Sequence, residues 1–572
     1  LELTSDKSST VASYDMNWVS ISNVKLDILG LRSASVVADA CKQIGINSRE
    51  INLDDEKIYQ NLYDLKHPHG LFQIEAETNF KVCKKVKPKN LEELSAVLAL
   101  ARPGALSFVD QYSNYTNNDV YEAIHPFFDD ILASTGGVAL YQEQLMKMAH
   151  KIGFTLDEAE ILRRIVGKKK VSEVRKWKKK IKDKIVENKL AEDVGDVLWK
   201  ILEDSANYSF NKSHSISYAA LAATTVYLKF SYPKEFFLAL LKMTRHEPDP
   251  ISEISKIHKE MDSFGIKLLP PHLTKSEMDF TVEGDNIRFG LLSIKGISDK
   301  SIEKLASFKG DYDSKFKIFE AAKQASLNIG SVCALIQAGA LEGDFSQSRT
   351  KIVYEAQLWN ILTPKEKVLC HRFADKLKYD LVEIIKYLKN NVDEKGKPFI
   401  KESRIETIRK KSQPYAKIFH INKVSESFAN WYYEKNLLGY TYNKSLKDIF
   451  KDDHRGLTTA REACDAALRT KIKLVGSVED DPYSGVSRSA KKSRYMRMNV
   501  GDDTGSIKIM IFNDKMDSFK SRYSVKNKDI VLVTGTKFED VIFADEIIVK
   551  SEKVFTKLSE IKDSESEEVL DI

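Results

Sequence analysis

Two groups of residues in this chain of 572 residues have the types and spacing to bind a polyphosphate and a ring. The first is the cationic stretch 163–184, which has twelve Lys or Arg and two acids, a net charge of +10 in 22 residues. The second is the segment 210–218, FNKSHSISY, in which Asn211, His214 and Tyr218 recur at i, i+3 and i+7. Arg binds phosphate through paired hydrogen bonds and Lys acts as a point charge, while His and Tyr offer rings with polar atoms. The predicted chemistry is recognition of a polyphosphate together with a base.

The cationic stretch follows a pair of predicted helices. Apolar residues recur at helical spacing from residue 141 to 152, so this part reads as an amphipathic helix. Thr155 with Glu158 three residues later is a capping-box pattern that starts a second helix. We expect Gly167 to end that helix, with Arg163 and Arg164 in its last turn, where cations suit the helix dipole.

A solvated helix face is the usual alternative for a run of charges. The capped helix before the run and Trp177 within it favour contact with a polyanion instead. We therefore predict that Arg163, Arg164, Lys168 and Lys169 bind phosphates. The residues predicted to contact DNA from the same stretch are Lys170, Arg175, Lys178 and Lys179.

The second group begins a predicted helix that is rich in Ala and ends before Pro233. Its spacing places Asn211, His214 and Tyr218 on one face of that helix. A single His or Tyr in such a helix is more often a core residue than a ligand-binding residue. Three polar ring or amide groups on one face favour a binding site.

A short alternating stretch, VKLDILGL at residues 24–31, reads as a β-strand. Its apolar residues point to one side, and Lys25 and Asp27 point to the other. An amine and a carboxylate placed side by side could serve a phosphate and a metal ion. A surface ion pair is the simpler alternative.

Taken in order, the motifs resemble the C family of bacterial and phage replicative DNA polymerases. The segment FNKSHSISY is similar to the family's GFNKSH-x-x-Y, and HGLFQIEA at 69–76 is similar to GVFQLES. ALARPGAL at 99–106 resembles ALYRPGP, and NLLGYTYNKSL at 436–446 loosely resembles LLGFYLSGHPL. The matching segments cover roughly residues 15–550, and their order carries the resemblance more than any single motif.

The resemblance implies roles for named residues. Asp27 matches the third catalytic aspartate and would bind Mg²⁺, and Lys25 would lie near the triphosphate. Lys212, His214 and Tyr218 would line the site of the incoming dNTP. Two-metal nucleotidyl transfer needs further carboxylates. The family's upstream Asp-x-Asp pair has no counterpart among Glu2, Asp6 and Asp15, the acids before Asp27.

The family comparison also predicts the organisation of the chain, a multidomain α+β protein. We expect the C-terminal strand of the palm at 1–30, mostly helical fingers at 31–275 and a small module with a helix-hairpin-helix-like region at 276–345. We expect a helical connecting region at 346–465, an OB-fold β-barrel at 466–552 and an acidic disordered tail at 553–572. A small core helix pair is an equally good alternative for the hairpin region.

The expected barrel is a series of short β runs separated by Gly and Asp turns. The segment 502–505 is predicted to be a hairpin turn, with Ile507, Ile509 and Ile511 on the inward face of the following strand. Such barrels bind single strands with basic and aromatic residues, and the candidates here are Arg494, Tyr495 and Arg497. A barrel used only for protein contacts is the alternative.

Composition agrees with a chain of several well-cored domains. Hydrophobic residues make up 42% and charged residues 30%, with a net charge of +6. No apolar run approaches the roughly 20 residues that span a membrane. The five cysteines lie far apart, which favours reduced thiols over a zinc site or a disulfide framework. We expect a cytoplasmic protein, in the bacterial cytoplasm or nucleoid, with a phage origin left open.

The sequence therefore predicts part of a DNA polymerase that binds primer–template DNA and dNTPs. With one matching aspartate, it is expected to be inactive alone and to pair with an N-terminal half that carries the palm and a phosphoesterase (PHP) module. One alternative is a non-catalytic DNA-binding or scaffold subunit derived from such a polymerase. A second is that the chain is a truncated piece of one long polymerase. The segment 357–362, QLWNIL, resembles a sliding-clamp peptide, but a helix face explains it equally well.

Overall fold

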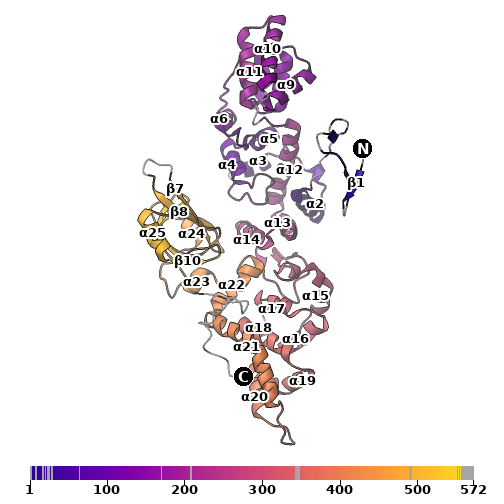
Figure 1. Cartoon of the computed structure of the whole chain (residues 1–572), viewed down its shortest axis with the longest axis vertical. Coiled ribbons are helices and arrows are strands. Elements are labelled where there is room, and N and C mark those ends of the chain that lie inside the picture. The colour runs from indigo at the N-terminus through magenta and orange to yellow at the C-terminus, as the bar shows by residue number, and fades with distance from the viewer. Residues whose placement is uncertain are drawn as a thin grey trace.

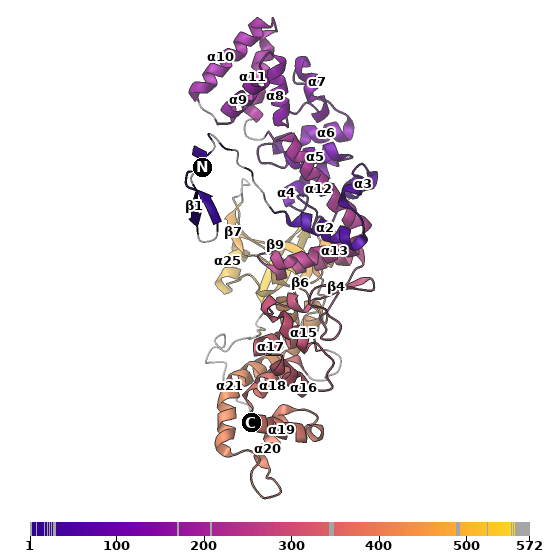
Figure 2. The same cartoon turned by 90° about the vertical axis from the view of Figure 1, so that its right-hand side faces the viewer.

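The computed structural model describes the chain except residues 1–2, 7–8, 16–17, 20, 22, 24–25, 27–29, 64, 169–170, 206–208, 342–347, 488–491, 523, 551, 553 and 555–572. For residues 3–6, 9–10, 166–168, 171–175, 514 and 521–522 it describes the backbone alone. The molecule is elongated, with helix α10 (Val171–Glu187) at one end, helix α20 (Leu381–Asn390) towards the other, and a β-barrel beside its middle (Figures 1 and 2).

The first helical unit, called the base lobe here, packs around one long helix, α12. The small side chains of Ala219, Ala222 and Ala223 on α12 let helix α5 approach closely, and all three are fully buried. The helices of the base lobe are α3 (Glu56–Tyr63), α4 (Glu77–Val86), α5 (Leu91–Leu100), α6 (Val109–Asn118) and α12 (Lys212–Ser231).

The second unit, the tip lobe, has its own core, which includes Leu145, Leu162 and Trp177. Its helices are α7 (Asp129–Leu132), α8 (Gln142–Lys151), α9 (Leu156–Lys168), α10 and α11 (Glu192–Ser205). The predicted capping box is confirmed: the Thr155 N–H donates to Glu158, and the Glu158 N–H donates to the Thr155 hydroxyl at 3.2 Å. The predicted end at Gly167 is wrong, since α9 continues to Lys168; glycine also adopts the right-handed helical conformation.

The body of the molecule is built around the largest hydrophobic core, which joins residues of α2 with buried residues between Leu228 and Tyr440. Its first part contains α2 (Arg32–Ile44), α13 (Pro233–Met243), α14 (Pro250–Met261) and the strands β3 (Leu268–Leu269), β4 (Thr281–Glu283) and β5 (Asn286–Arg288). Strand β5 is central, parallel to β3 and antiparallel to β4. The helices that follow are α15 (Ile302–Phe308), α16 (Lys315–Gln324), α17 (Ile329–Gln337), α18 (Arg349–Ile361), α19 (Pro364–Phe373), α20, α21 (Glu402–Val424) and α22 (Glu426–Leu438).

The segment that resembles a clamp peptide lies mostly in α18. Leu358 and Trp359 are 0% and 2% exposed and belong to the body core. Trp359 stacks on Phe316 with ring centroids 4.8 Å apart. The helix-face interpretation therefore accounts for this apolar pattern.

The C-terminal domain is a closed barrel of the OB type, as predicted. Around the barrel the strands run in the order β6, β10, β11, β9, β8, and pairing of β6 with β8 closes it. Helix α25 (Asn513–Arg522) connects β9 to β10. The predicted inward face is confirmed, since Ile507, Ile509 and Ile511 are buried in the barrel core. The strands are β6 (Lys471–Val478), β7 (Tyr483–Val486), which pairs with β8 outside the closed ring, β8 (Arg494–Gly501), β9 (Ser506–Phe512), β10 (Ile530–Phe538) and β11 (Val541–Val549).

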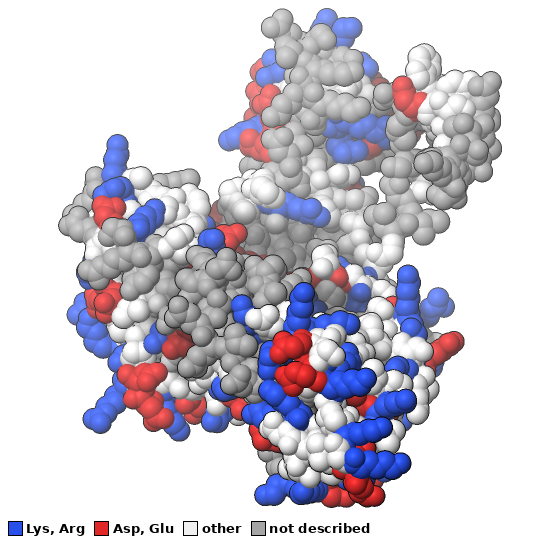
Figure 3. Space-filling model, turned by 60° about the horizontal axis from the view of Figure 1, so that its bottom comes forward, with Lys and Arg blue, Asp and Glu red and all other residues white. Residues whose placement is uncertain are grey.

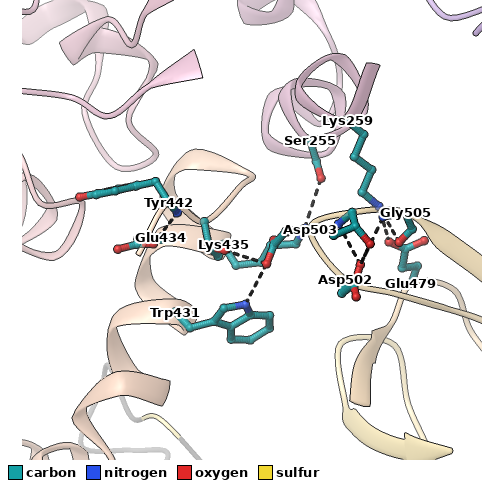
Figure 4. Close-up of polar contacts among 12 residues, drawn as sticks. Ser255, Lys259, Trp431, Glu434, Lys435, Tyr442, Glu479, Asp502, Asp503 and Gly505 are labelled. Carbon is teal, nitrogen blue, oxygen red and sulfur yellow. Dashed lines mark hydrogen bonds and ion pairs between the residues drawn. The ribbon is translucent and has the colours of Figure 1, made fainter. Parts of the chain in front are cut away.

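Polar contacts hold the barrel against α14 and α22 (Figure 4). Asp503, in the turn between β8 and β9, accepts hydrogen bonds from the Thr441 hydroxyl at 2.7 Å and the Trp431 indole at 3.4 Å. Lys259 of α14 lies 3.1 Å from Glu479 at the end of β6. Gly439 ends α22 with φ +88°, and a Cβ there would come within 2.4 Å of the Ile251 carbonyl oxygen, so the glycine lets α22 approach α14.

A buried ion pair joins the base lobe to the body. Lys229, near the end of α12, pairs with Glu260 of α14, and their side chains are 0% and 7% exposed. The same Lys229 ammonium donates to the carbonyl oxygens of His67 and His69 at 2.8 and 2.7 Å. Because all three ammonium protons have acceptors, this cation can be buried without an unpaired donor.

At the N-terminus the structure describes a short hairpin of β1 (Leu3–Asp6) and β2 (Ser9–Ala12). Lys25 and Asp27 lie outside the described residues, as does the acidic tail from residue 555. Among the described helices, none combines the length and apolar composition needed to cross a membrane.

The buried pair gives a prediction for stability. Replacing Glu260 by Ala leaves the Lys229 charge without its carboxylate, and we expect a loss of about 3–5 kcal/mol in the free energy of unfolding. Urea unfolding of the full chain measures it. Glu77→Ala, which breaks an exposed pair with Lys81 on α4, is the control and should cost less than about 1 kcal/mol. Equal losses in the two variants would contradict the role given to the buried pair.

Candidate functional site

The two predicted arginines lie side by side on α9 and share one carboxylate. Arg163 donates two hydrogen bonds to Glu160, each 2.8 Å, and Arg164 donates one of 2.7 Å to the same side chain. Hydrogen bonds from Arg163, and then from Arg164, hold the pKa of the Glu160 carboxyl at about 2. The guanidinium groups are thus fixed at the tip-lobe edge by a neighbour in the same helix.

The N-terminus of α12 is capped from two sides. The Asn211 side-chain oxygen accepts the His214 N–H at 2.8 Å, which is an ordinary N-cap bond. Glu143, in the first turn of α8, accepts the Lys212 backbone N–H at 3.0 and 3.1 Å and the Asn211 side-chain amide at 3.0 Å. A carboxylate from the tip lobe therefore occupies the anion-binding end of a base-lobe helix.

This junction connects the two sets of predicted residues. The hydrogen bond with Glu160 raises the pKa of the Arg163 guanidinium, and the charge of Glu143, the carboxylate that caps α12, raises it further. The Lys212 ammonium is 3.0 Å from Glu92 of α5 and 5.6 Å from the Tyr141 ring centroid. Helix α8 thus links the two sets, because it packs on α9 and carries the carboxylate that caps α12.

A row of rings runs along the same end of α12. The Arg102 guanidinium lies 4.9 Å from the Phe210 ring, and Phe210 lies 5.5 Å from His214. The His214 and Tyr218 ring centroids are 4.1 Å apart, as their shared face predicts, and Tyr218 contacts Phe72 at 5.1 Å. His214 is exposed and Tyr218 half-buried, so the row offers a partly open stacking surface.

Buried hydroxyl groups fix the position of α12 beneath this row. The Ser95 hydroxyl donates to the Ser215 hydroxyl at 2.9 Å, and Ser215 donates back to the Ser95 carbonyl oxygen at 2.8 Å. The Ser95 hydroxyl also contacts the Tyr141 hydroxyl at 3.1 Å. Backbone hydrogen bonds between Phe210 and the strand-like residues 140–142 complete the junction.

Helix α10 carries exposed cations next to α9. Lys178 and Lys179 are exposed, and Trp177 between the lobe helices is buried. The opposite end of the molecule, built from α15–α21, shows Lys and Arg mixed with Asp and Glu (Figure 3). Several of those cations are paired, for example Lys351 with Asp380.

The three predicted barrel residues lie on β8, with Tyr495 and Arg497 on its outer face. The Arg497 guanidinium lies 4.9 Å from the Tyr483 ring, and Arg494 pairs with Asp517 at 2.5 Å. Rings of neighbouring strands extend the surface in the order Tyr483, Tyr495, Phe512, Phe543 and Phe538, with successive centroids 4.8–6.3 Å apart. This aromatic row crosses β8 and β9, the face with which OB barrels bind nucleic acids.

The structure thus places Arg163 and Arg164 on α9, which packs on α8, and Lys212, His214 and Tyr218 at the start of α12, which Glu143 of α8 caps. The barrel residues lie on a separate surface. Sequence reasoning missed Glu143, Glu160, Arg102 and Phe210 as parts of the arrangement around α9 and α12. Asp27, Lys25, Lys169 and Lys170 lie outside the described residues, and for Lys168 and Arg175 only the backbone is described. Within the described part, no group of three or more His, Cys, Asp or Glu side chains could hold a metal ion.

Comparison with known proteins identifies two parts of the chain. Residues 31–189 match the family model of the bacterial DNA polymerase III alpha subunit finger domain. Residues 265–352 match a helix-hairpin-helix motif, which includes α15–α17. The helix-hairpin-helix prediction is therefore confirmed.

Relatives of the chain are bacterial proteins named DNA polymerase III subunit alpha. That of Aquifex aeolicus is 36% identical over 363 residues, which cover 60% of this chain and 31% of the relative. Those of Thermus aquaticus and Halalkalibacterium halodurans are 31% and 32% identical over 59% and 56% of this chain, and 29% of each relative. The matched part is less than a third of these relatives.

The double cap of α12 gives a second prediction. Asn211→Ala removes the side-chain acceptor for the His214 N–H, and we expect a loss of about 0.5–2 kcal/mol in stability. Hydrogen exchange should show faster opening of the first turn of α12, residues 212–215. Asn211→Ser, which keeps an N-cap acceptor, is the matched control and should lose less than Asn211→Ala. Equal exchange in both variants and the wild type would show that Glu143 alone caps the helix.

Proposed function

We propose that this chain, a relative of bacterial DNA polymerase III alpha subunits with that family's finger domain at residues 31–189, is part of a template-directed DNA polymerase. In this proposal it holds primer–template DNA and the incoming dNTP. The observation that carries it is the arrangement called the α9–α12 junction below: α8 packs on the cationic helix α9 and, through Glu143, caps α12 with its row of rings.

In this proposal the cations bind the triphosphate of the dNTP. Arg163 and Arg164 present guanidinium groups that match pairs of phosphate oxygens, and Lys212 adds a point charge from α12. Lys168 and Lys169, four and five residues after Arg164 in sequence, are assigned to the same phosphates. Donors from two lobes favour a ligand that reaches both, as a triphosphate does.

In this proposal the row of rings along α12 packs against the nucleoside of the dNTP. His214 and Tyr218 form a surface on which a base or sugar can pack, because every base has an apolar π-face. Phe210 and Arg102 extend this surface towards the loop at residues 102–104. The aromatic contacts beneath Tyr218, including that to Phe72, support its position.

Two further surfaces are assigned to DNA. Lys170, Arg175, Lys178 and Lys179 of the α10 region would contact phosphates of the primer–template. Arg494, Tyr495 and Arg497, with the aromatic row of the barrel, would bind an unpaired strand by stacking and charge. The helix-hairpin-helix region at 265–352 supports a further duplex contact through backbone amides.

The metal site is assigned by resemblance to the family's motif. Asp27 is assigned as a Mg²⁺ ligand, with Lys25 near the phosphates, from the family motif alone. The described residues offer no cluster that fits a metal ion, so no reaction step is derived through one. A two-ion site needs several carboxylates, and we assign the remaining ones to protein outside these 572 residues, in a partner half that carries the palm.

The second candidate function is that of a non-catalytic DNA-binding subunit. The barrel surface and the α10 cations would serve it equally well. The α9–α12 junction favours the polymerase, because a pure DNA binder has no need for cations and rings arranged for a nucleotide. A sliding clamp as a partner gains no support from residues 357–362, whose apolar side chains Leu358 and Trp359 lie in the body core.

Primer extension tests the proposal. The full chain with Mg²⁺, four dNTPs and a labelled primer–template should bind the DNA without extending it. Adding a protein that supplies the aspartate pair should start extension, and Arg163→Gln should then lower its rate. Extension by the chain alone would refute the assignment of the remaining ligands to a partner, and absence of DNA binding would refute the proposed function.

The α10 cations give a prediction about salt. Replacing Lys178 and Lys179 together by Gln should weaken primer–template binding similarly for all sequences and lower the slope of log K against log salt by about 1 per lysine. Fluorescence anisotropy at several salt concentrations measures both. The control replaces Lys376 and Lys378, at the other end of the molecule, and should leave the slope unchanged.

A further inference from the structure

The described groups that are assigned to phosphate on α9 and at the start of α12 each contact an internal carboxylate. Glu160 accepts three hydrogen bonds from Arg163 and Arg164. Glu143 accepts the Lys212 backbone N–H and the Asn211 amide, and Glu92 pairs with the Lys212 ammonium. These three acids come from three different helices, α9, α8 and α5.

We propose that Glu143 and Glu160 are built-in anions, which occupy the phosphate-binding groups until a polyphosphate displaces them. The inference rests on the proposed function and adds a regulatory property to the same site. Glu92 acts in the same way on the Lys212 side chain.

The physical consequence is selection by charge density. An exposed carboxylate gains little from one ion pair, so a ligand with several charges can displace it when it engages several donors at once. A single phosphate reaches fewer of these donors and must still displace a resident carboxylate. The site should therefore reject inorganic phosphate and admit a triphosphate.

The Glu160 carboxylate remains charged in the physiological range. Arg163 and Arg164 hold the pKa of Glu160 at about 2, below the ordinary value of a glutamate, so its stabilising pairing is present at neutral pH and is lost only as pH falls towards that value. Mild acid therefore does not release Arg163 and Arg164 from Glu160. Displacement by the ligand is the remaining way to release the arginines.

A purely structural role for the two glutamates makes the opposite prediction. If Glu160 only supports α9 and Glu143 only caps α12, neutralising them loosens the site and weakens ligand binding. If they compete with the ligand, neutralising them strengthens binding. The sign of the change in affinity therefore separates the two roles.

The test is titration of the full chain with inorganic tripolyphosphate by calorimetry. Glu143→Gln keeps an acceptor oxygen for the Lys212 N–H but removes the charge, and Glu160→Gln does the same for the arginines. Each variant should bind tripolyphosphate about three- to tenfold more tightly, as expected for loss of one partly exposed competing carboxylate charge. Both should also bind inorganic phosphate more readily than the wild type does.

Glu406→Gln is the matched control. Glu406 pairs with Arg409 at i, i+3 in α21, like Glu160 with Arg163, but lies at the other end of the molecule. It changes the net charge equally and should leave tripolyphosphate affinity unchanged. A gain in all three variants would mean that net charge, and not the site, sets the affinity.

The remaining outcomes are also distinguishable. Unchanged or weaker binding in Glu143→Gln and Glu160→Gln, with binding still lost in Arg163→Gln, would overturn the inference and leave the proposed function standing. If the wild type and both variants bind no tripolyphosphate, the phosphate site itself is wrongly assigned and both proposals fail. Glu160 is partly exposed within one helix, so its variant remains informative if Glu143→Gln proves unstable.

Discussion

Helix α12 is the element on which the arrangement depends, because it is buried along most of its length and contacts both neighbouring units. Its Ala-rich face lets α5 pack closely, its end is tied to α14 by Lys229 and Glu260, and its start is held by Glu143 of α8. A helix fixed at both ends presents His214 and Tyr218 at a defined position relative to Arg163. Any movement of the tip lobe against the base lobe must change this junction.

The candidate DNA surfaces follow one another along the molecule (Figures 1 and 2). The α9–α12 junction and α10 lie in the tip and base lobes, the helix-hairpin-helix region lies in the body, and the barrel is anchored to α14 and α22 through Asp503 and Glu479. Since α14 contacts the base lobe through Glu260 and the barrel through Lys259, adjacent residues of one helix fix the base lobe relative to the barrel.

Features with a local or periodic signal could be predicted from the sequence. They include the capping box at Thr155, the shared face of His214 and Tyr218, and the inward isoleucines of β9. The contacts of Glu143 with residues 68 and 69 positions away could not, because one polar residue far along the chain leaves no periodic pattern. Gly167 misled the prediction of a helix end, since glycine permits a left-handed turn without requiring it.

Hydrogen exchange of the full chain with primer–template, with and without the complementary dNTP, tests the central claim most directly. The claim is that α9 and α12 together bind the nucleotide. Addition of the complementary dNTP should slow exchange in residues 156–168 and 211–218 together, while a non-complementary dNTP should have a smaller effect. Slower exchange elsewhere, with both of these segments unchanged, would contradict the account.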